Sequence, residues 1–273
     1  MTSRRPSASM PPWRICPKPR PGFNSRSGHW RGLSGMTDLG LKTVKVFADG
    51  ANLEAMLELA GQPEIAGFTT NPTLMRQCGV SDYEGFARKL LEHITDRPIS
   101  FEVFADEHGE MLRQARLIAS WASNVYVKIP VTDTRGTSTA AVVRELSDSG
   151  VHLNVTALMT VPQVEVITSA VAGSPGAIIS VFAGRVADTG RDPIPLMKAA
   201  LETMAPYPEL ELLWASPREI LNVWQADDIG VHIITVTHDL LKKLTLFGKD
   251  LDAFSLETVR MFHGDAATAG FFL

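Results

Sequence analysis

One lysine lies in the middle of a short apolar run, and its side chain could carry out covalent chemistry. The run reads Val125-Tyr126-Val127-Lys128-Ile129-Pro130. It predicts a β-strand, because β-branched and aromatic residues dominate it. Two interpretations of Lys128 follow from this position. A lysine can protect the exposed edge of a sheet against pairing with other chains, or a desolvated lysine can attack a carbonyl carbon and form an imine.

The imine interpretation requires an amine that has lost its proton. An unperturbed lysine, with a pKa of about 10.4, is neutral roughly once in 2,000 molecules at pH 7. Burial disfavours the ammonium form and can recover as much as about three pK units. Imine chemistry also needs groups that move protons, and Asp49 and Glu102 each end a similar apolar run. An amine with two carboxyl groups suits an aldol reaction.

The elements that must position these residues recur along the chain. Eight short β-branched runs alternate with helical patterns from residue 41 onward. An open doubly wound sheet is one arrangement, but eight units in this length match a (β/α)8 barrel, which closes its sheet and leaves no edge strand. A closed barrel removes the edge-strand interpretation of Lys128. The predicted strands are 44–49, 65–71, 99–104, 125–130, 152–157, 177–183, 210–216 and 231–237.

Polar side chains stand at the carboxyl ends of most of these strands. In a (β/α)8 barrel these ends converge on one mouth, where the active sites of this fold lie. We therefore expect one site that contains Asp49, Asn71, Glu102, Lys128, Asn154, Thr156, Ser180, Phe182, Arg185, Ser216 and Arg218. Within this set the amides and hydroxyls suit sugar hydroxyl groups, and the arginines suit a phosphate.

Two of these residues also have purely structural interpretations. Asp49 could cap a helix that begins near Ala51. Arg185 could form an ion pair with Asp188, which lies three residues further along the chain.

Composition bounds the class of protein. The chain has 273 residues, is 45% hydrophobic and carries a formal charge of −4, which predicts a globular protein with one large core. No apolar run reaches the roughly 20 residues of a membrane span. Cys16 and Cys78 form neither a metal-binding spacing nor a disulfide framework, so we expect a reducing compartment, the cytoplasm, and no bound metal. The acidic body argues against nucleic acid as a partner.

The first 36 residues differ from the rest. They contain six arginines, one lysine and six prolines but no acidic residue, and they lack the apolar periodicity of a folded segment. We expect a disordered basic extension over 1–36 and a single barrel domain over 37–273. The extension could be a transit peptide, a basic arm for nucleic acid, or the result of an upstream start codon, with the true start at Met36.

Seven short motifs resemble the transaldolase family. The resemblance covers about residues 44–247. The two most specific motifs are the Thr-Thr-Asn-Pro stretch and the lysine of the fourth strand. The motifs are Phe47-Ala48-Asp49, Thr69-Thr70-Asn71-Pro72-Thr73-Leu74, Phe101-Glu102-Val103, Val127-Lys128-Ile129-Pro130, Asn154-Val155-Thr156, Phe182-Ala183-Gly184-Arg185 and Ala215-Ser216-Pro217-Arg218.

The resemblance implies a class I Schiff-base aldolase on a (β/α)8 barrel without a cofactor. It implies that Lys128 forms the imine, that Asp49 is the acid and base for bond cleavage, and that Glu102 with Thr156 positions a catalytic water. It further assigns Asn71, Asn154 and Ser180 to the dihydroxyacetone unit, and Arg185, Ser216 and Arg218 to the phosphate.

Two further properties follow from the same resemblance. A rival branch of the family, the direct fructose-6-phosphate aldolases, has Gln in place of Glu102 and Tyr in place of Phe182, so this chain favours transfer over release. A barrel kept only for binding or assembly is the non-enzymatic alternative.

Compact members of the family form decamers, and we expect residues 256–273 to form a helix that packs on a neighbouring subunit.

Overall fold

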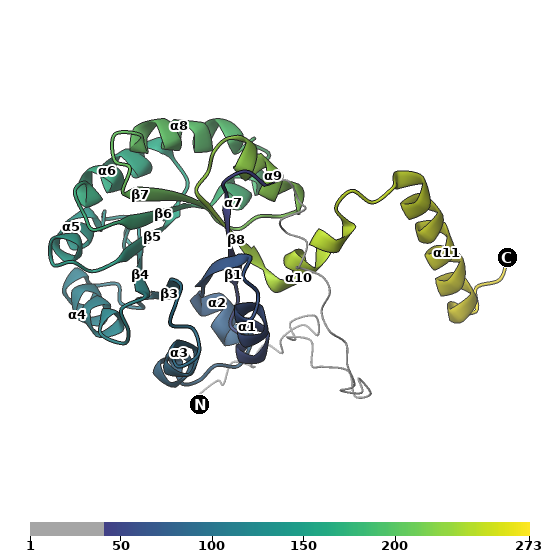
Figure 1. The fold of residues 1–273 in the computed structure, drawn as a ribbon, viewed down its shortest axis with the longest axis horizontal. Helices are drawn as coiled ribbons and strands as arrows, with labels where there is room; N and C mark the ends of the chain where they lie inside the picture. The colour runs from purple at the N-terminus through teal and green to yellow at the C-terminus, as the bar shows by residue number, and fades with distance from the viewer. Residues whose placement is uncertain (1–40) are drawn as a thin grey trace, which may run out of the picture.

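The computed structural model describes residues 41–273. The basic extension predicted for residues 1–36 lies outside the described residues. Eight parallel strands form a closed barrel in sequence order, and helices surround it (Figure 1). The (β/α)8 fold expected from the sequence is therefore confirmed. The strands are β1 (Lys45–Asp49), β2 (Ile65–Thr69), β3 (Ile99–Glu102), β4 (Val125–Pro130), β5 (Leu153–Leu158), β6 (Ala177–Val181), β7 (Leu210–Trp214) and β8 (Ile233–Thr237).

Most of the helices follow a strand and pack on the outside of the barrel. Several begin at a side chain that accepts a hydrogen bond from the first turn, such as Asn52, Asp82 and Thr160. The helical segments are α1 (Leu53–Ala60), α2 (Pro72–Gln77), α3 (Tyr83–Leu91), α4 (His108–Ala119), α5 (Ala140–Asp148), α6 (Val161–Val171), α7 (Ala183–Asp188), α8 (Ile194–Met204), α9 (Leu221–Asp228), α10 (His238–Leu241), the 3-10 helix η2 (Lys242–Leu246) and α11 (Leu251–Ala269).

Strand β1 closes the barrel against β8. Five consecutive residue pairs join the two strands, from Lys45 opposite Ile233 to Asp49 opposite Thr237. Because the sheet has no free edge, the edge-strand interpretation of Lys128 is wrong. A buried lysine in a closed barrel needs another explanation.

An apolar layer fills the barrel below its mouth. Phe47, Ile178 and Ile233 pack together there with Leu213, and none of them is more than 1% exposed. Close packing of this layer requires a glycine on β2, because a Cβ at Gly67 would lie 2.6 Å from the Phe47 ring. Each of Phe47, Ile178 and Ile233 precedes an inward-facing polar residue by two positions, so a polar layer lies directly above the apolar one.

Helix α11 departs from the arrangement of the other helices. It projects away from the ring of helices at the carboxyl end of the chain (Figure 1), and none of its residues is buried against the described part of the chain. It begins five residues earlier than the helix expected over 256–273 and ends at Ala269. Within residues 41–273, no helix combines the length and the hydropathy needed to cross a bilayer.

Candidate active site

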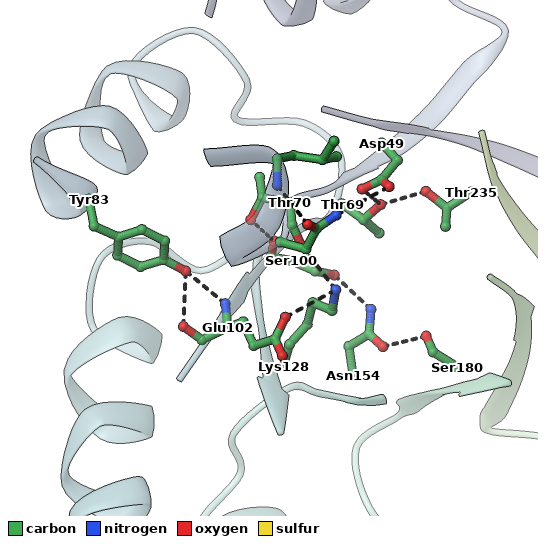
Figure 2. Close-up of polar contacts among 12 residues, drawn as sticks. Asp49, Thr69, Thr70, Tyr83, Ser100, Glu102, Lys128, Asn154, Ser180 and Thr235 are labelled. Carbon is green, nitrogen blue, oxygen red and sulfur yellow. Dashed lines mark hydrogen bonds and ion pairs between the residues drawn. The ribbon is translucent and has the colours of Figure 1, made fainter. Parts of the chain in front are cut away.

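Lys128 extends from β4 into the mouth of the barrel, between strands that carry the other polar residues. It pairs across the sheet with Glu102 on β3 and with Asn154 on β5. Lys128 is only 7% exposed. Its Nζ donates a hydrogen bond of 2.9 Å to the carbonyl oxygen of Thr70 and lies 3.5 Å from Oε2 of Glu102 (Figure 2). The Lys128 amine and the Glu102 carboxylate, both expected in the site, therefore lie in ion-pair contact.

Asp49 ends β1 on another side of the same mouth. Its Oδ1 accepts a hydrogen bond of 2.9 Å from Thr69 Oγ1, and its Oδ2 accepts one of 3.4 Å from Asn71 Nδ2. Burial of the carboxyl group raises the pKa of Asp49, although the Lys128 charge and the two hydrogen bonds oppose the rise. A carboxyl group with a raised pKa is suited to giving and taking a proton near neutral pH.

The alternative interpretation of Asp49 as a helix cap is wrong. Helix α1 begins at Leu53, and its cap is Asn52, whose side chain accepts from the backbone N–H of Ala55. Asp49 is thus left to face the mouth.

Asn71 has two structural contacts in the structure. Its Oδ1 caps helix α2 by accepting a hydrogen bond of 2.9 Å from the backbone N–H of Leu74, and its Nδ2 faces Asp49. The Asn-Pro sequence favours this arrangement, because Pro72 begins the helix at a position where its missing N–H costs nothing. The expected residue thus lies in the site and orients the carboxyl group of Asp49.

Asn154 and Ser180 form a buried chain with a residue that the sequence did not single out. Ser180 Oγ donates a hydrogen bond of 2.6 Å to Asn154 Oδ1, and Asn154 Nδ2 donates one of 2.9 Å to Ser100 Oγ (Figure 2). Ser100 precedes Glu102 by two residues on β3, so strand parity could have identified it. All three side chains are at most 2% exposed.

Thr156 carries the unsatisfied polar group of the site. Within residues 41–273, its Oγ1 is buried and has no hydrogen-bond partner. The next residue, Ala157, has a φ of 67°, and the pairing of β5 with β6 shifts register between Val155 and Leu158. This bulge interrupts regular pairing next to Thr156, and pairing resumes at Leu158 opposite Val181. A buried hydroxyl without a partner keeps its capacity to form a hydrogen bond to a water or a ligand.

The expected phosphate residues lie on α7 and on the loop after β7. Ser216 has a φ of 61°, and a Cβ at Gly184 would lie 1.5 Å from the carbonyl oxygen of Ser216. Only glycine permits this close approach of α7 to the loop. The Arg185 guanidinium lies 5.1 Å from the centre of the Phe182 ring, which places it in cation–π contact.

Asp188 pairs with Arg218 and not with Arg185. The guanidinium of Arg218 donates two hydrogen bonds to the Asp188 carboxylate, from Nε at 2.9 Å and from Nη2. The ion pair suggested for Arg185 is therefore corrected to Arg218, which reaches α7 from the loop after β7. Both side chains are about half exposed, so a bound anion can reach the guanidinium.

Tyr83 is the second residue of the site that the sequence analysis did not identify. It begins helix α3, and its hydroxyl group bonds the backbone of Glu102 on both sides (Figure 2). Nothing in the spacing of the sequence links α3 with the end of β3. In the part of the chain that the structure describes, no group of three or more His, Cys, Asp or Glu side chains could hold a metal ion.

Comparison with known proteins identifies a family and several relatives. Residues 46–270 match the family described as Transaldolase/Fructose-6-phosphate aldolase. Three relatives carry the names "Probable transaldolase" or "Probable transaldolase 2". A protein of Dehalococcoides mccartyi is 34% identical over 202 residues, which are 74% of this chain and 90% of the relative. One of Streptococcus equi subsp. zooepidemicus is 37% identical over 204 residues, with 74% and 90% covered. One of Listeria monocytogenes is 33% identical over 223 residues, with 78% and 98% covered.

Solved structures support the fold alone. A Burkholderia cenocepacia protein described as a lyase/mutase aligns with a TM-score of 0.53 at 11% sequence identity, and the alignment covers 89% of this chain and 90% of that chain. At this identity the likeness extends to the barrel and not to its chemistry.

Proposed function

Because the chain belongs to the transaldolase/fructose-6-phosphate aldolase family, we propose that it is a transaldolase that works through an imine on Lys128. It transfers a dihydroxyacetone unit from a ketose phosphate to an aldose phosphate, in the cytoplasm and as a step of the pentose phosphate pathway. The proposed reaction converts sedoheptulose 7-phosphate and glyceraldehyde 3-phosphate into erythrose 4-phosphate and fructose 6-phosphate. The observation that carries the proposal is the buried amine of Lys128, 3.5 Å from a carboxylate.

Imine formation is the first step of the proposed mechanism. The neutral amine of Lys128 attacks C2 of the ketose, and the carbinolamine that forms loses water. Glu102 is within reach of the nitrogen, at 3.5 Å, and Thr156 offers a buried hydroxyl with no partner in the described residues. Together they hold the water that carries protons to and from the carbinolamine oxygen.

Carbon–carbon cleavage is assigned to Asp49. The carboxylate takes the proton of the C4 hydroxyl, the C3–C4 bond breaks, and its electrons move into the protonated imine to give an enamine. The aldose phosphate leaves, and the aldehyde of a second aldose phosphate is attacked by the enamine. Asp49 then returns its proton to the new hydroxyl group. The raised pKa of Asp49 supports both directions of this transfer.

The remaining residues of the mouth are assigned to recognition. We assign Asn154 and Ser180 to the hydroxyl groups of the dihydroxyacetone unit, because their hydrogen-bonded chain fixes the direction of each polar atom. We assign Asn71 to the same unit, because its Nδ2 donates a hydrogen bond to the Asp49 carboxylate. Arg185, Ser216 and Arg218 are assigned to the phosphate, with Phe182 beneath the Arg185 guanidinium.

Borohydride trapping tests the imine. Incubation with fructose 6-phosphate and sodium borohydride is expected to add a reduced dihydroxyacetone or hexose adduct to Lys128, located by peptide mass spectrometry. The Lys128→Arg variant keeps the positive charge and should carry no adduct and show no turnover. An adduct on a different lysine would assign the imine to that residue and remove Lys128 from the mechanism. No adduct in the wild type would remove the imine mechanism and favour a barrel that binds without catalysis.

Release of free dihydroxyacetone is the rival activity. Glu102 and Phe182 favour transfer. The branch of the family that releases dihydroxyacetone has Gln and Tyr at these two positions. A coupled assay with fructose 6-phosphate, with and without erythrose 4-phosphate, separates the two. The proposal expects turnover that depends on the acceptor, whereas an acceptor-independent rate with free dihydroxyacetone as product would assign the chain to the aldolases.

We also propose that the protein assembles with copies of itself through α11. Leu251, Phe254, Leu256, Val259, Met261 and Phe262 are large apolar side chains of this helix, and each is between 40% and 78% exposed. Large apolar side chains exposed together on one helix mark a contact with another protein, and this helix projects away from the barrel (Figure 1). Light scattering is expected to show an oligomer that dissociates in a Phe254→Asp, Phe262→Asp double variant. A wild-type monomer at micromolar concentration would contradict this.

A further inference from the structure

The backbone of Glu102 lies where the barrel ladder is interrupted. The pairing of β2 with β3 consists of Phe68 opposite Ile99 and Thr69 opposite Ser100. Beyond Thr69 the chain leaves the sheet, because Asn71 and Pro72 begin helix α2. On its other side β3 continues to pair with β4 as far as Glu102 and Lys128. Among residues 41–273, Glu102 therefore has no strand partner on the β2 side.

The hydroxyl group of Tyr83 occupies the place of the missing strand. The backbone N–H of Glu102 donates to the Tyr83 oxygen at 2.8 Å, and the Tyr83 hydroxyl donates to the Glu102 carbonyl oxygen at 3.0 Å (Figure 2). One side chain thus satisfies both main-chain groups of the residue that carries the carboxylate. Burial raises the pKa of Tyr83, so the hydroxyl remains protonated and keeps its donor across neutral pH.

The ring of Tyr83 is held by three other aromatic side chains. It packs edge-to-face on Phe104 at 4.4 Å and on Phe101 at 6.2 Å between ring centres. Trp121 lies 5.9 Å away and itself packs edge-to-face on Phe101. Since Phe101 and Phe104 flank Glu102 in the chain, the cluster ties α3 to the segment that presents the carboxylate. Such contacts restrict the ring to one orientation.

From this arrangement we infer that Tyr83 is a positioning residue, which holds the Glu102 carboxylate against the Lys128 amine by fixing the Glu102 backbone. The inference rests on the proposed function, because it assigns Tyr83 to the proton transfers of the imine. Tyr83 does not touch the amine, and it acts through Glu102. A glutamate side chain has three rotatable bonds, so the position of its backbone decides which atoms its carboxylate can reach.

The Tyr83→Phe substitution tests this role, because it removes the hydroxyl and keeps the ring. We expect kcat for the transfer reaction to fall about tenfold, while KM for fructose 6-phosphate stays within about twofold. The same substitution in the Glu102→Gln background should change kcat by less than about twofold, since the carboxylate that Tyr83 positions is then absent. Equal losses in both backgrounds would assign Tyr83 a general structural role and overturn the inference.

Tyr207→Phe is the matched control. Tyr207 is half-buried and packs on the core outside the mouth, so the same chemical change there should leave kcat unaltered. A crystal structure of Tyr83→Phe supplies a measurement that does not depend on turnover. The distance from Lys128 Nζ to Glu102 Oε2, 3.5 Å here, should exceed about 4 Å in the variant. An unchanged distance overturns the inference. If the wild type neither transfers nor releases dihydroxyacetone, the proposed function fails, and this distance still decides the role of Tyr83.

Discussion

Two aspartates at opposite ends of the barrel show how differently one side chain is used. Asp49 lies at the mouth with two side-chain hydrogen-bond donors, and burial raises its pKa. Asp227, near the end of α9, is 5% exposed. It accepts four hydrogen bonds of 2.9 to 3.0 Å from the backbone N–H groups of Lys42, Thr43 and Val44. Burial opposes ionisation of Asp227, but these donors outweigh it, and its pKa is lowered.

The difference separates a residue that fixes the fold from a residue to which we assign chemistry. Asp227 is saturated with donors and holds the segment that leads into β1, where the barrel closes against β8. At the mouth, polar groups are left with capacity to bind something else, as the Thr156 hydroxyl illustrates among residues 41–273. Fully satisfied polar groups add stability, whereas groups held ready for a ligand cost stability. Substitutions at the mouth should therefore lower activity more than stability. Substitutions at the opposite end of the barrel, its base, should lower stability more than activity.

The largest effect is expected for Lys128→Met. Transfer activity should fall by at least about 10⁴-fold because the nucleophile is lost. The free energy of unfolding should fall by less than about 2 kcal/mol, because the apolar side chain packs well in the buried position but leaves the Glu102 carboxylate without its partner. Coupled assays and urea titrations measure the two quantities. A large loss of stability would show that the mouth also holds the fold together.

Asp49→Asn should lower kcat by about 10²- to 10³-fold, because the amide cannot take a proton. Its effect on stability depends on pH with a definite sign. The pKa of Asp49 is raised on folding, so the stability that this group contributes is complete below about pH 4 and is lost as the pH rises through the folded pKa. The variant should therefore gain stability relative to the wild type between pH 4 and pH 7. Urea midpoints at several pH values check this. A variant that loses stability relative to the wild type as the pH rises would show that the pKa of Asp49 is lowered on folding.

Asp227→Asn should act on stability and spare catalysis. We expect a loss of about 2 to 3 kcal/mol at pH 7, because an amide oxygen cannot replace a carboxylate that accepts from several N–H groups. The lowered pKa of Asp227 means that its contribution is present above about pH 4 and is lost as the pH falls through the folded pKa. Wild type and variant should thus converge in acid. The rate per folded molecule at 25 °C should stay within about twofold.

The smallest effect is expected for Lys45→Met at the base of the barrel. Lys45 Nζ lies 2.5 Å from Glu211 Oε1, but half of the lysine side chain is exposed. Such pairs contribute about 0 to 1 kcal/mol, and activity should not change. Thermal melts at low and high salt provide the measurement. A loss of stability as large as that of Asp227→Asn would show that the Lys45–Glu211 ion pair stabilises this end of the barrel as much as the hydrogen bonds to Asp227 do.

Strand positions could be predicted from sequence because β-branched runs and the barrel spacing agree. The run 125–130 matches β4 at both ends, and every other predicted strand differs from the structure by at most two residues at either end. Boundaries at the mouth were less accurate, since Asn71 and Ala183 extend apolar runs but belong to the starts of α2 and α7. Short helices between a strand and its main helix have no period long enough to detect.

The site was predictable to the extent that its residues lie on strands. Parity and strand order brought Asp49, Lys128 and Asn154 together before any coordinates were considered. Tyr83 could not be found in this way, because its role depends on where β2 stops pairing, which no local pattern encodes. The partner of Asp188 was equally undetermined, since Arg218 lies 30 residues away from it in the chain.

Asn71 joins two tasks in one side chain. The oxygen of its amide caps a helix, while the nitrogen of the same amide donates a hydrogen bond to the carboxylate of Asp49, to which we assign the proton transfers. A substitution that keeps the helix start, such as aspartate, would put two negative groups face to face, and one that relieves this conflict would unravel the first turn. Laboratory evolution of new substrates should consequently find this position closed to change, even while neighbouring positions on the rim accept variation.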